Sequence, residues 1–334
     1  MVNHPGCTFT RHVREILLGR PLVTDDSPLE PLDWLRRLPN ITTLKLTGYP
    51  VLPGAMTEIP DIEPRLGRLP CLTTLSLHGI TFVTLAAFIS MLSMLPDLLD
   101  LNLQNVCIND TRIENKVSTV LRIPTDILSK LGRLHLCLLE NSSDALVLLL
   151  PTLLSAKLVR YPPITEVHLQ LPRSEAEVTL HLCELLRRIS SRLTTIRIRI
   201  GQHDVDAAEL GRLEFAQFAQ LRSFTVELLR TTLWLGDEWE DGLNPRNIGI
   251  LLAALQAPTL HTLTIHLLVL DAPHGPGTHM SWESLDRCLD ILPLLKDVRL
   301  IIHAPALDLD TATNRICELL PRAVSRGILR FGSG

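Results

Sequence analysis

Short blocks in which hydrophobic and polar residues alternate recur along this chain. In the segment 37–46, for example, Leu44 and Leu46 flank the polar Lys45. Alternation with a period of two places every second side chain on the same side of an extended strand. We therefore expect each block to form a strand with one buried and one exposed face.

Two of these blocks are near copies of each other. The sequence Arg37-Leu-Pro-Asn-Ile-Thr-Thr-Leu-Lys-Leu46 returns as Arg68-Leu-Pro-Cys-Leu-Thr-Thr-Leu-Ser-Leu77, and seven of the ten positions are identical. After one further residue each copy is followed by a glycine, Gly48 or Gly79. Two looser copies of the centre begin at Leu193 and Leu260. The near-verbatim copies indicate internal repetition.

The relaxed pattern apolar-x-x-apolar-x-apolar begins ten times, at intervals of 26 to 39 residues. Its starts are Val13, Ile41, Leu72, Leu98, Leu131, Ile164, Leu193, Leu221, Leu260 and Leu295. In a chain that is 46% hydrophobic, three apolar residues at this spacing often occur by chance, so the relaxed pattern alone proves nothing. The prediction therefore depends on the close copies, the even spacing and the alternating polar residues.

Segments with helical spacing of apolar residues lie between the strand blocks. The clearest are Thr84–Leu95, Glu175–Ile189, Asn247–Gln256, Trp282–Leu292 and Thr311–Val324. A strand, a loop, a helix and a turn repeated at about thirty residues form the leucine-rich-repeat unit. We therefore expect residues 1–334 to form one α/β leucine-rich-repeat solenoid of about ten irregular repeats. Its parallel strands would line the concave face of a curved arc, with the helices on the convex face.

The repeat blocks resemble those of fungal F-box proteins with irregular leucine-rich repeats, which have similar Leu-Pro-x-Leu-x-x-Leu-x-Leu blocks at uneven spacing. The opening His4-Pro5, which runs into Phe9–Leu18, also resembles the first strand after the F-box in those chains. The resemblance covers nearly the whole length. It implies a non-enzymatic scaffold for protein–protein interaction, acting as the substrate-recognition arc of a ubiquitin-ligase adaptor.

The chain departs from this pattern in two ways. The usual Asn or Cys three residues after the second strand leucine is absent, so no ladder of Asn side chains is expected in the turns. Those places hold Tyr49, Ile80, Val106, Leu139 and Gly201. The sequence before Val13 is also too short for an F-box, so we expect an adaptor that lacks its F-box, by analogy alone.

Composition narrows the functional classes. A net charge of −4 and a pI near 6.3 disfavour nucleic-acid binding, which usually shows a basic footprint. The seven cysteines form no CxxC motif, which favours reduced thiols inside the cell. The start of the chain lacks the apolar core of a signal peptide, and the most apolar stretch, Ala145–Val159, is too short to cross a bilayer. We expect a protein of the cytoplasm or nucleus without a membrane segment.

A partner would bind to the polar side of the strands. If the apolar members of each block point inward, its third and fifth residues and the residue just after it face outward. The candidate partner-binding residues are Lys45, Asn102, Arg133, His135, Glu166, His168, Arg197, Arg199, Glu227 and Arg299. Acids and bases nearly balance over all the outward positions of the ten blocks, which suits a protein or peptide partner. A merely solvated face is the alternative.

Two other features of the strands and loops are candidates for binding. His135 and His168 occupy equivalent positions in adjacent repeats and are expected to be cross-strand neighbours, although two exposed imidazoles are the simpler interpretation. The loop Arg230–Asn247 carries Trp234 and Trp239 beside an acidic run. These tryptophans would form a rim-loop binding site for a basic partner or fold back against the helices.

No constellation for catalysis, metal binding or cofactor binding emerges from the sequence. His261, His266, His274 and His279 match no zinc-ligand spacing. A G-x-G-x-x-G motif, a Walker loop and a G-x-S-x-G elbow are all missing. We therefore expect a protein that is not an enzyme and holds no cofactor. The remaining alternatives are a degenerate repeat protein without a retained partner and a hydrolase on a repeat scaffold.

Overall fold

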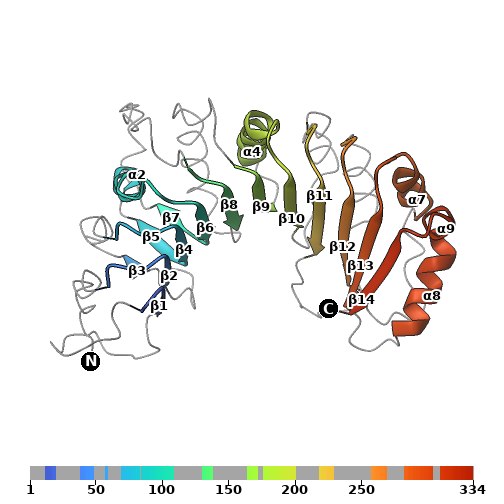
Figure 1. Cartoon of the computed structure of the whole chain (residues 1–334), viewed down its shortest axis with the longest axis horizontal. Helices are drawn as coiled ribbons and strands as arrows, with labels where there is room; N and C mark the ends of the chain where they lie inside the picture. The colour runs from blue at the N-terminus through green and yellow to red at the C-terminus, as the bar shows by residue number, and fades with distance from the viewer. Residues whose placement is uncertain are drawn as a thin grey trace. The chain divides into compact units, whose positions relative to one another are not determined.

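The computed structural model describes the strands, several helices and the adjoining turns. The described residues are 12–19, 38–48, 57–58, 69–82, 84–108, 130–137, 164–171, 176–200, 218–228, 257–268, 282–303 and 309–333. The chain divides into two compact units, residues 1–164 and residues 165–334. In both units parallel strands follow one another in chain order (Figure 1).

The first unit contains a main parallel sheet and a small second sheet. The main sheet has the order β1 (Glu15–Gly19), β2 (Thr43–Thr47), β4 (Thr74–His78), β6 (Asp100–Gln104) and β8 (Arg133–Cys137). The small sheet has the order β3 (Thr57–Glu58), β5 (Ile80–Phe82) and β7 (Cys107–Ile108). Helix α2 (Leu85–Ser93) packs on β5, where the rings of Phe88 and Phe82 meet edge to face at 5.0 Å.

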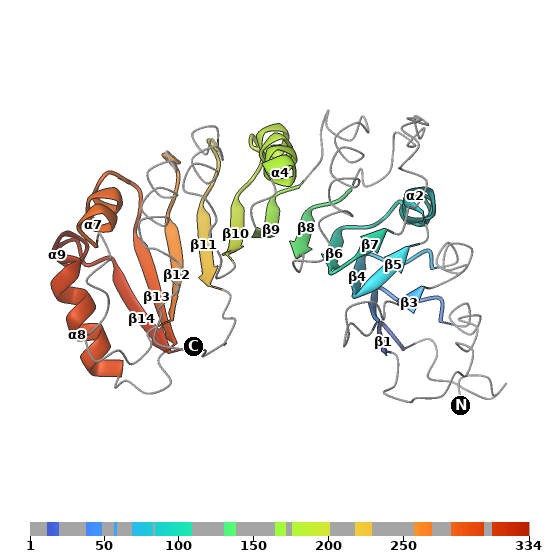
Figure 2. The ribbon, with the colours of Figure 1, turned by 180° about the vertical axis from the view of Figure 1, so that it is seen from behind.

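The second unit continues the same pattern. Its parallel strands are β9 (Glu166–Leu171), β10 (Thr195–Ile200), β11 (Ser223–Leu228), β12 (Thr262–Leu268), β13 (Asp297–His303) and β14 (Leu329–Ser333). Its described helices are α4 (Ala176–Ile189), α7 (Trp282–Asp290), α8 (Leu309–Leu319) and α9 (Pro321–Ser325). Within each unit the helices lie on one side of the main sheet, as the two opposite views show (Figures 1 and 2).

The apolar members of the blocks form the core, as the alternation predicts. Leu44 lies in register with Leu75 in the first unit, and all solvent is excluded from both side chains. Ile196, Phe224 and Leu263 form an equivalent buried row in the second unit. These rows confirm the expected repeat fold, because like positions of successive repeats stack on one another.

The strands begin two residues after each predicted start. The first apolar residue of a block, such as Ile41 or Leu72, is buried but belongs to the preceding turn, where its N–H donates to the carbonyl three residues earlier. The carbonyl of the second residue accepts two N–H groups from the next repeat. Thr42 O, for example, accepts from Thr73 and Thr74, both at 2.9 Å.

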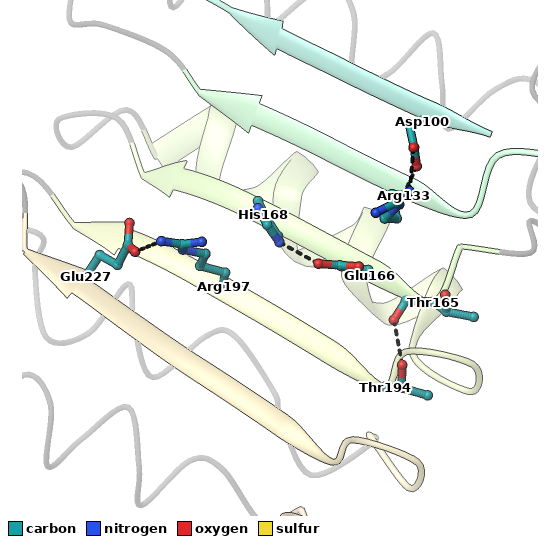
Figure 3. Close-up of polar contacts among 8 residues, drawn as sticks. All are labelled: Asp100, Arg133, Thr165, Glu166, His168, Thr194, Arg197 and Glu227. Carbon is teal, nitrogen blue, oxygen red and sulfur yellow. Dashed lines mark hydrogen bonds and ion pairs between the residues drawn. The ribbon is translucent and has the colours of Figure 1, made fainter. Parts of the chain in front are cut away.

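The repeated Thr-Thr pair has a structural role in these turns. The hydroxyl of Thr42 donates to the carbonyl of Arg14 at 3.2 Å, and the hydroxyl of Thr73 donates to that of Thr42 at 3.2 Å. In the second unit Thr194 donates to the carbonyl of Thr165 at 3.1 Å (Figure 3). The first threonine therefore adds a side-chain hydrogen bond to the backbone bonds that join neighbouring repeats.

The turns after the first strands are joined by backbone hydrogen bonds. Gly48 N donates to His78 O at 2.7 Å, and Gly79 N donates to Gln104 O at 2.8 Å. In the next repeat the N–H donor is Asn105. The backbone φ angle is positive at both Gly79 (62°) and Asn105 (52°). Glycine and asparagine tolerate this left-handed conformation. These repeats of the first unit therefore form a backbone ladder one residue before the sequence positions at which the repeat family usually has Asn or Cys.

Three features differ from the sequence-based expectation. Strand β14 adds a repeat to the expected ten, and the small sheet β3-β5-β7 was not expected. The predicted helix 311–324 is two helices, α8 and α9, because Pro321 cannot continue the hydrogen-bond pattern of α8. The predicted helix 247–256 lies outside the described residues.

The last helices are held by two side chains from different repeats. Asp286 of α7 is buried, and its carboxylate accepts the N–H groups of Arg322 and Ala323 at 3.1 Å each. Arg326 donates to the carbonyls of Leu289, Leu292 and Leu295. The carboxylate satisfies N–H groups at the start of α9, and the guanidinium binds carbonyls at the end of α7 and in the turn that follows it.

Candidate functional site

The side of each main sheet opposite its helices is the candidate site, here called the open face. It carries the third residue, the fifth residue and the trailing residue of each block, which form the third, fifth and trailing rows across the strands. In β2, Lys45 is exposed between the buried Leu44 and Leu46. The polar members of the strands are therefore the ones that solvent or a partner can reach.

All ten predicted strand residues lie in these three rows of the described strands. Lys45, Asn102, Arg133 and His135 belong to the first unit. Those of the second unit are Glu166, His168, Arg197, Arg199, Glu227 and Arg299. Trp234 and Trp239 of the predicted rim loop lie outside the described residues. The use of these residues for binding stays a prediction.

The charges of the first unit are paired between neighbouring strands. Lys45 Nζ lies 2.6 Å from Glu15 Oε1 of the preceding strand. Arg133 binds Asp100 with two N–H groups, at 2.5 and 2.6 Å, and Thr74 donates to the same carboxylate at 3.3 Å. The Asp100 carboxylate therefore joins three successive strands, β4, β6 and β8, and Figure 3 shows its contact with Arg133.

The second unit concentrates its charges around Glu227. Arg197 of β10 donates a hydrogen bond to this carboxylate (Figure 3), and Arg199 lies 3.4 Å from its other oxygen. His266 Nε2 of β12 lies 3.6 Å from Oε1. Glu227 was expected to be exposed, but only 11% of its side chain is accessible, because side chains from both neighbouring strands surround it.

Two smaller pairs lie on the same face. His168 Nε2 is 2.8 Å from Glu166 Oε1 on the same strand, and Arg299 Nε donates to Asp297 at 2.7 Å. Residues two apart on a strand face the same side, which brings each pair together. His135 lies in the first unit and His168 in the second, so their expected contact stays a prediction.

Burial and neighbouring charge act on Arg197. Partial burial lowers the pKa of its guanidinium from the ordinary value, and repulsion by Arg199 lowers it further, while Glu166 opposes the shift. The arginine stays charged at neutral pH, since its ordinary pKa is far above 7. The shift indicates that the cation is partly desolvated and lies close to a second cation.

Several interacting residues were absent from the candidate set. Glu15, Asp100, Asp297 and His266 all belong to the predicted rows and bind candidate residues. The same row positions could have identified them, because a charge opposite a candidate is its natural partner. Arg330 was missed because strand β14 was not predicted.

The other chemical candidates of the sequence lead to no site in the described structure. Within the described ranges, no group of three His, Cys, Asp or Glu side chains is arranged to hold a metal. His261 contacts the carbonyl of Thr259, and His274 and His279 lie outside the described residues. Burial raises the pKa of the Cys288 thiol, which disfavours the reactive thiolate. None of the described helices is long and apolar enough to cross a membrane.

Comparison with known proteins supports the fold. A scan of protein-family models and a search of curated proteins both find no match to this chain. Among solved structures, the chain is similar to the leucine-rich-repeat-containing protein LegL7 from Legionella pneumophila. The similarity covers 96% of both chains, with 18% sequence identity and a TM-score of 0.52. The architecture is therefore that of an α/β leucine-rich-repeat solenoid.

Proposed function

We propose that this protein is a non-enzymatic scaffold that binds a protein partner through the open face of its sheets. The observation that carries the proposal is the distribution of side chains across the strands. Apolar side chains of the strands are buried, whereas the polar and charged side chains that alternate with them form rows on the other side of the sheet. Repeat proteins offer extended surfaces of this kind to their partners.

The pairing of charges supports a preformed surface. Ion pairs between strands, such as Lys45–Glu15 and Arg133–Asp100, hold long side chains in place before a partner arrives. Ordering of such side chains otherwise opposes association. The surface carries both signs of charge together with hydroxyl groups. Such a surface suits a protein partner better than it suits a nucleic acid, whose backbone is uniformly negative.

Affinity capture with face-specific variants tests the proposal. Thr225→Trp and Ser76→Trp place a large ring in the fifth row of the second and first units, and Arg187→Gln alters the helix α4 instead. We expect at least one Trp variant to lose a partner that the wild-type protein and Arg187→Gln retain. All variants should first show native circular dichroism. Equal capture by all four proteins, or no specific partner, would contradict the proposal.

The composition of the captured complex tests the finer role. The resemblance to F-box proteins suggests the substrate-recognition part of a ubiquitin-ligase adaptor, and the like-for-like stacking of the repeat blocks is compatible with that role. An adaptor would bring ligase subunits into the complex together with a substrate. A complex without ligase subunits would limit the function to scaffolding.

A further inference from the structure

On the open face of the second unit the arginines are more exposed than the acids that they bind, whereas His168, 26% exposed, is slightly less exposed than Glu166 at 31%. The Glu227 side chain is 11% exposed, whereas those of Arg197 and Arg199 are 44% and 48% exposed. Asp297 is 24% exposed and its partner Arg299 is 57% exposed. The formal charges of these groups nearly balance, but an approaching molecule mainly meets guanidinium groups.

The fifth row of this unit contains no acidic residue. In register across the strands β9 to β14, it consists of His168, Arg197, Thr225, Thr264, Arg299 and Arg330. The carboxylates of Glu166, Glu227 and Asp297 lie in the rows on either side. The row therefore has a cation near each end and two threonines between Arg197 and Arg299.

The arginines of this row retain donors for another acceptor. A guanidinium group carries five N–H donors. In the part of the chain that the structure describes, Arg197 is within ion-pair distance of one carboxylate, that of Glu227, and Arg299 of one, that of Asp297. The carboxylate of a partner could bind the exposed side of these groups in the two-point geometry that arginine favours.

The row has a defined length. Arg197 and Arg299 are three strand spacings apart, about 14 Å at roughly 4.8 Å per strand, which an extended chain covers in about four residues. The hydroxyl groups of Thr225 and Thr264 lie along this path and can bond to a peptide backbone. A peptide that crosses the strands could therefore place one carboxylate at each arginine.

We propose that the fifth row of the second unit binds an extended acidic segment of the partner, with carboxylate side chains about four residues apart at Arg197 and Arg299. This inference rests on the proposed scaffold function and adds the chemical class of the partner.

Peptide binding to the full chain tests this proposal. The probe is the fluorescein-labelled peptide Gly-Ser-Glu-Ser-Ala-Ser-Glu-Ser-Gly, and its matched control has Gln in place of both Glu. Fluorescence anisotropy at low ionic strength should show binding of the Glu peptide only. The double variant R197Q/R299Q should lower its affinity by about tenfold or more, because each arginine supplies charge-assisted hydrogen bonds. The charge-matched control R187Q/R188Q on helix α4 should leave the affinity unchanged.

A second variant separates binding from folding. E227Q removes the buried carboxylate that competes for Arg197 and Arg199, so it should bind the Glu peptide more tightly than the wild type. A purely structural role of these arginines predicts no such gain. Binding that is equal for the Glu and Gln peptides, or insensitive to R197Q/R299Q, would overturn the proposal, as would weaker binding by folded E227Q.

The two proposals can fail separately. Capture of a partner through the open face, combined with no binding of the Glu peptide, would overturn the acidic-segment proposal and leave the scaffold function standing. Loss of face-dependent capture would instead overturn the scaffold function itself.

Discussion

At Gly48 the backbone of one repeat approaches the next so closely that no side chain fits. A β-carbon at this position would lie 2.3 Å from the carbonyl oxygen of Gly79, which is far inside van der Waals contact. Gly79 itself has φ of 62°, which favours glycine. The two glycines that follow the near-identical blocks are therefore required by different physical constraints.

Substitution of Gly48 tests this close approach. Gly48→Ala should destabilise the protein by about 1–3 kcal/mol, because the backbone must move to relieve the overlap. Gly19→Ala is the matched control at the end of β1, where a β-carbon meets nothing within 4 Å. It should leave the free energy of unfolding unchanged or raise it slightly. Urea denaturation followed by circular dichroism measures both, and equal stability of the two variants would contradict the explanation.

At the scale of single elements, charges at helix ends and turns contribute to local stability. In α4, Glu184 accepts hydrogen bonds from Arg187 and Arg188, at 2.7 and 2.5 Å. These bonds lower the pKa of its carboxyl from 4.5 to about 2. The lowered pKa means that the folded state favours the charged form.

The pH dependence of α4 stability follows from this shift. A carboxylate with a lowered pKa stabilises the fold above pH 4.5, and this contribution is lost as the pH falls towards 2. Because solvent screens the exposed arginines, Glu184→Gln should lower the free energy of unfolding by less than about 1 kcal/mol at pH 7. The difference in unfolding free energy between variant and wild type should shrink between pH 5 and pH 3. Urea denaturation across this range measures it, and a constant difference would exclude the ion pairs as its cause.

The start of α9 depends on a buried carboxylate from another element. Asp286→Ala should destabilise the protein by roughly 2 kcal/mol, because two N–H groups at the helix start lose their acceptor. Asp290→Ala removes an exposed carboxylate 3.4 Å from Arg322 and should cost less than about 0.5 kcal/mol. Thermal unfolding measures the stability of both variants. Similar losses of stability would show that the Asp286 carboxylate is unimportant for the start of α9.

At the scale of the whole molecule, each repeat is stabilised by its neighbours. Leu263 lies between Phe224 and Val298 in a buried row, so its contacts belong to adjacent repeats. Leu75 occupies the equivalent row in the other compact unit. In such an architecture the stability is approximately a sum of repeat terms and nearest-neighbour terms.

Double-mutant cycles test this summation. Leu75→Ala and Leu263→Ala should each cost about 2–5 kcal/mol and should add within about 0.5 kcal/mol when combined. Leu263→Ala and Val298→Ala share a contact and should depart from additivity by more than this. Denaturant unfolding supplies the free energies. Strong coupling between Leu75 and Leu263 would contradict nearest-neighbour behaviour.

The accuracy of the sequence-based prediction depended on how local each feature is. All ten strand blocks were found, because alternation along a single segment decides which side chains are buried. Strand β14 was missed, since its block Leu329–Ser333 contains Gly332 and only one aromatic and one aliphatic side chain. The small sheet was missed because strands of two or three residues are too short to show a period.

The sequence alone therefore determined the repeat fold, the positions of ten strands of the main sheets and the residues on their polar sides. The tertiary structure decided how these residues combine: Glu227 lies beneath Arg197 and Arg199, and Asp286 reaches the start of α9. The physical reason is distance along the chain. Burial follows from neighbours two residues apart on a strand. Each of these polar contacts instead joins residues 28 to 37 positions apart, which only the stacking of successive repeats brings together.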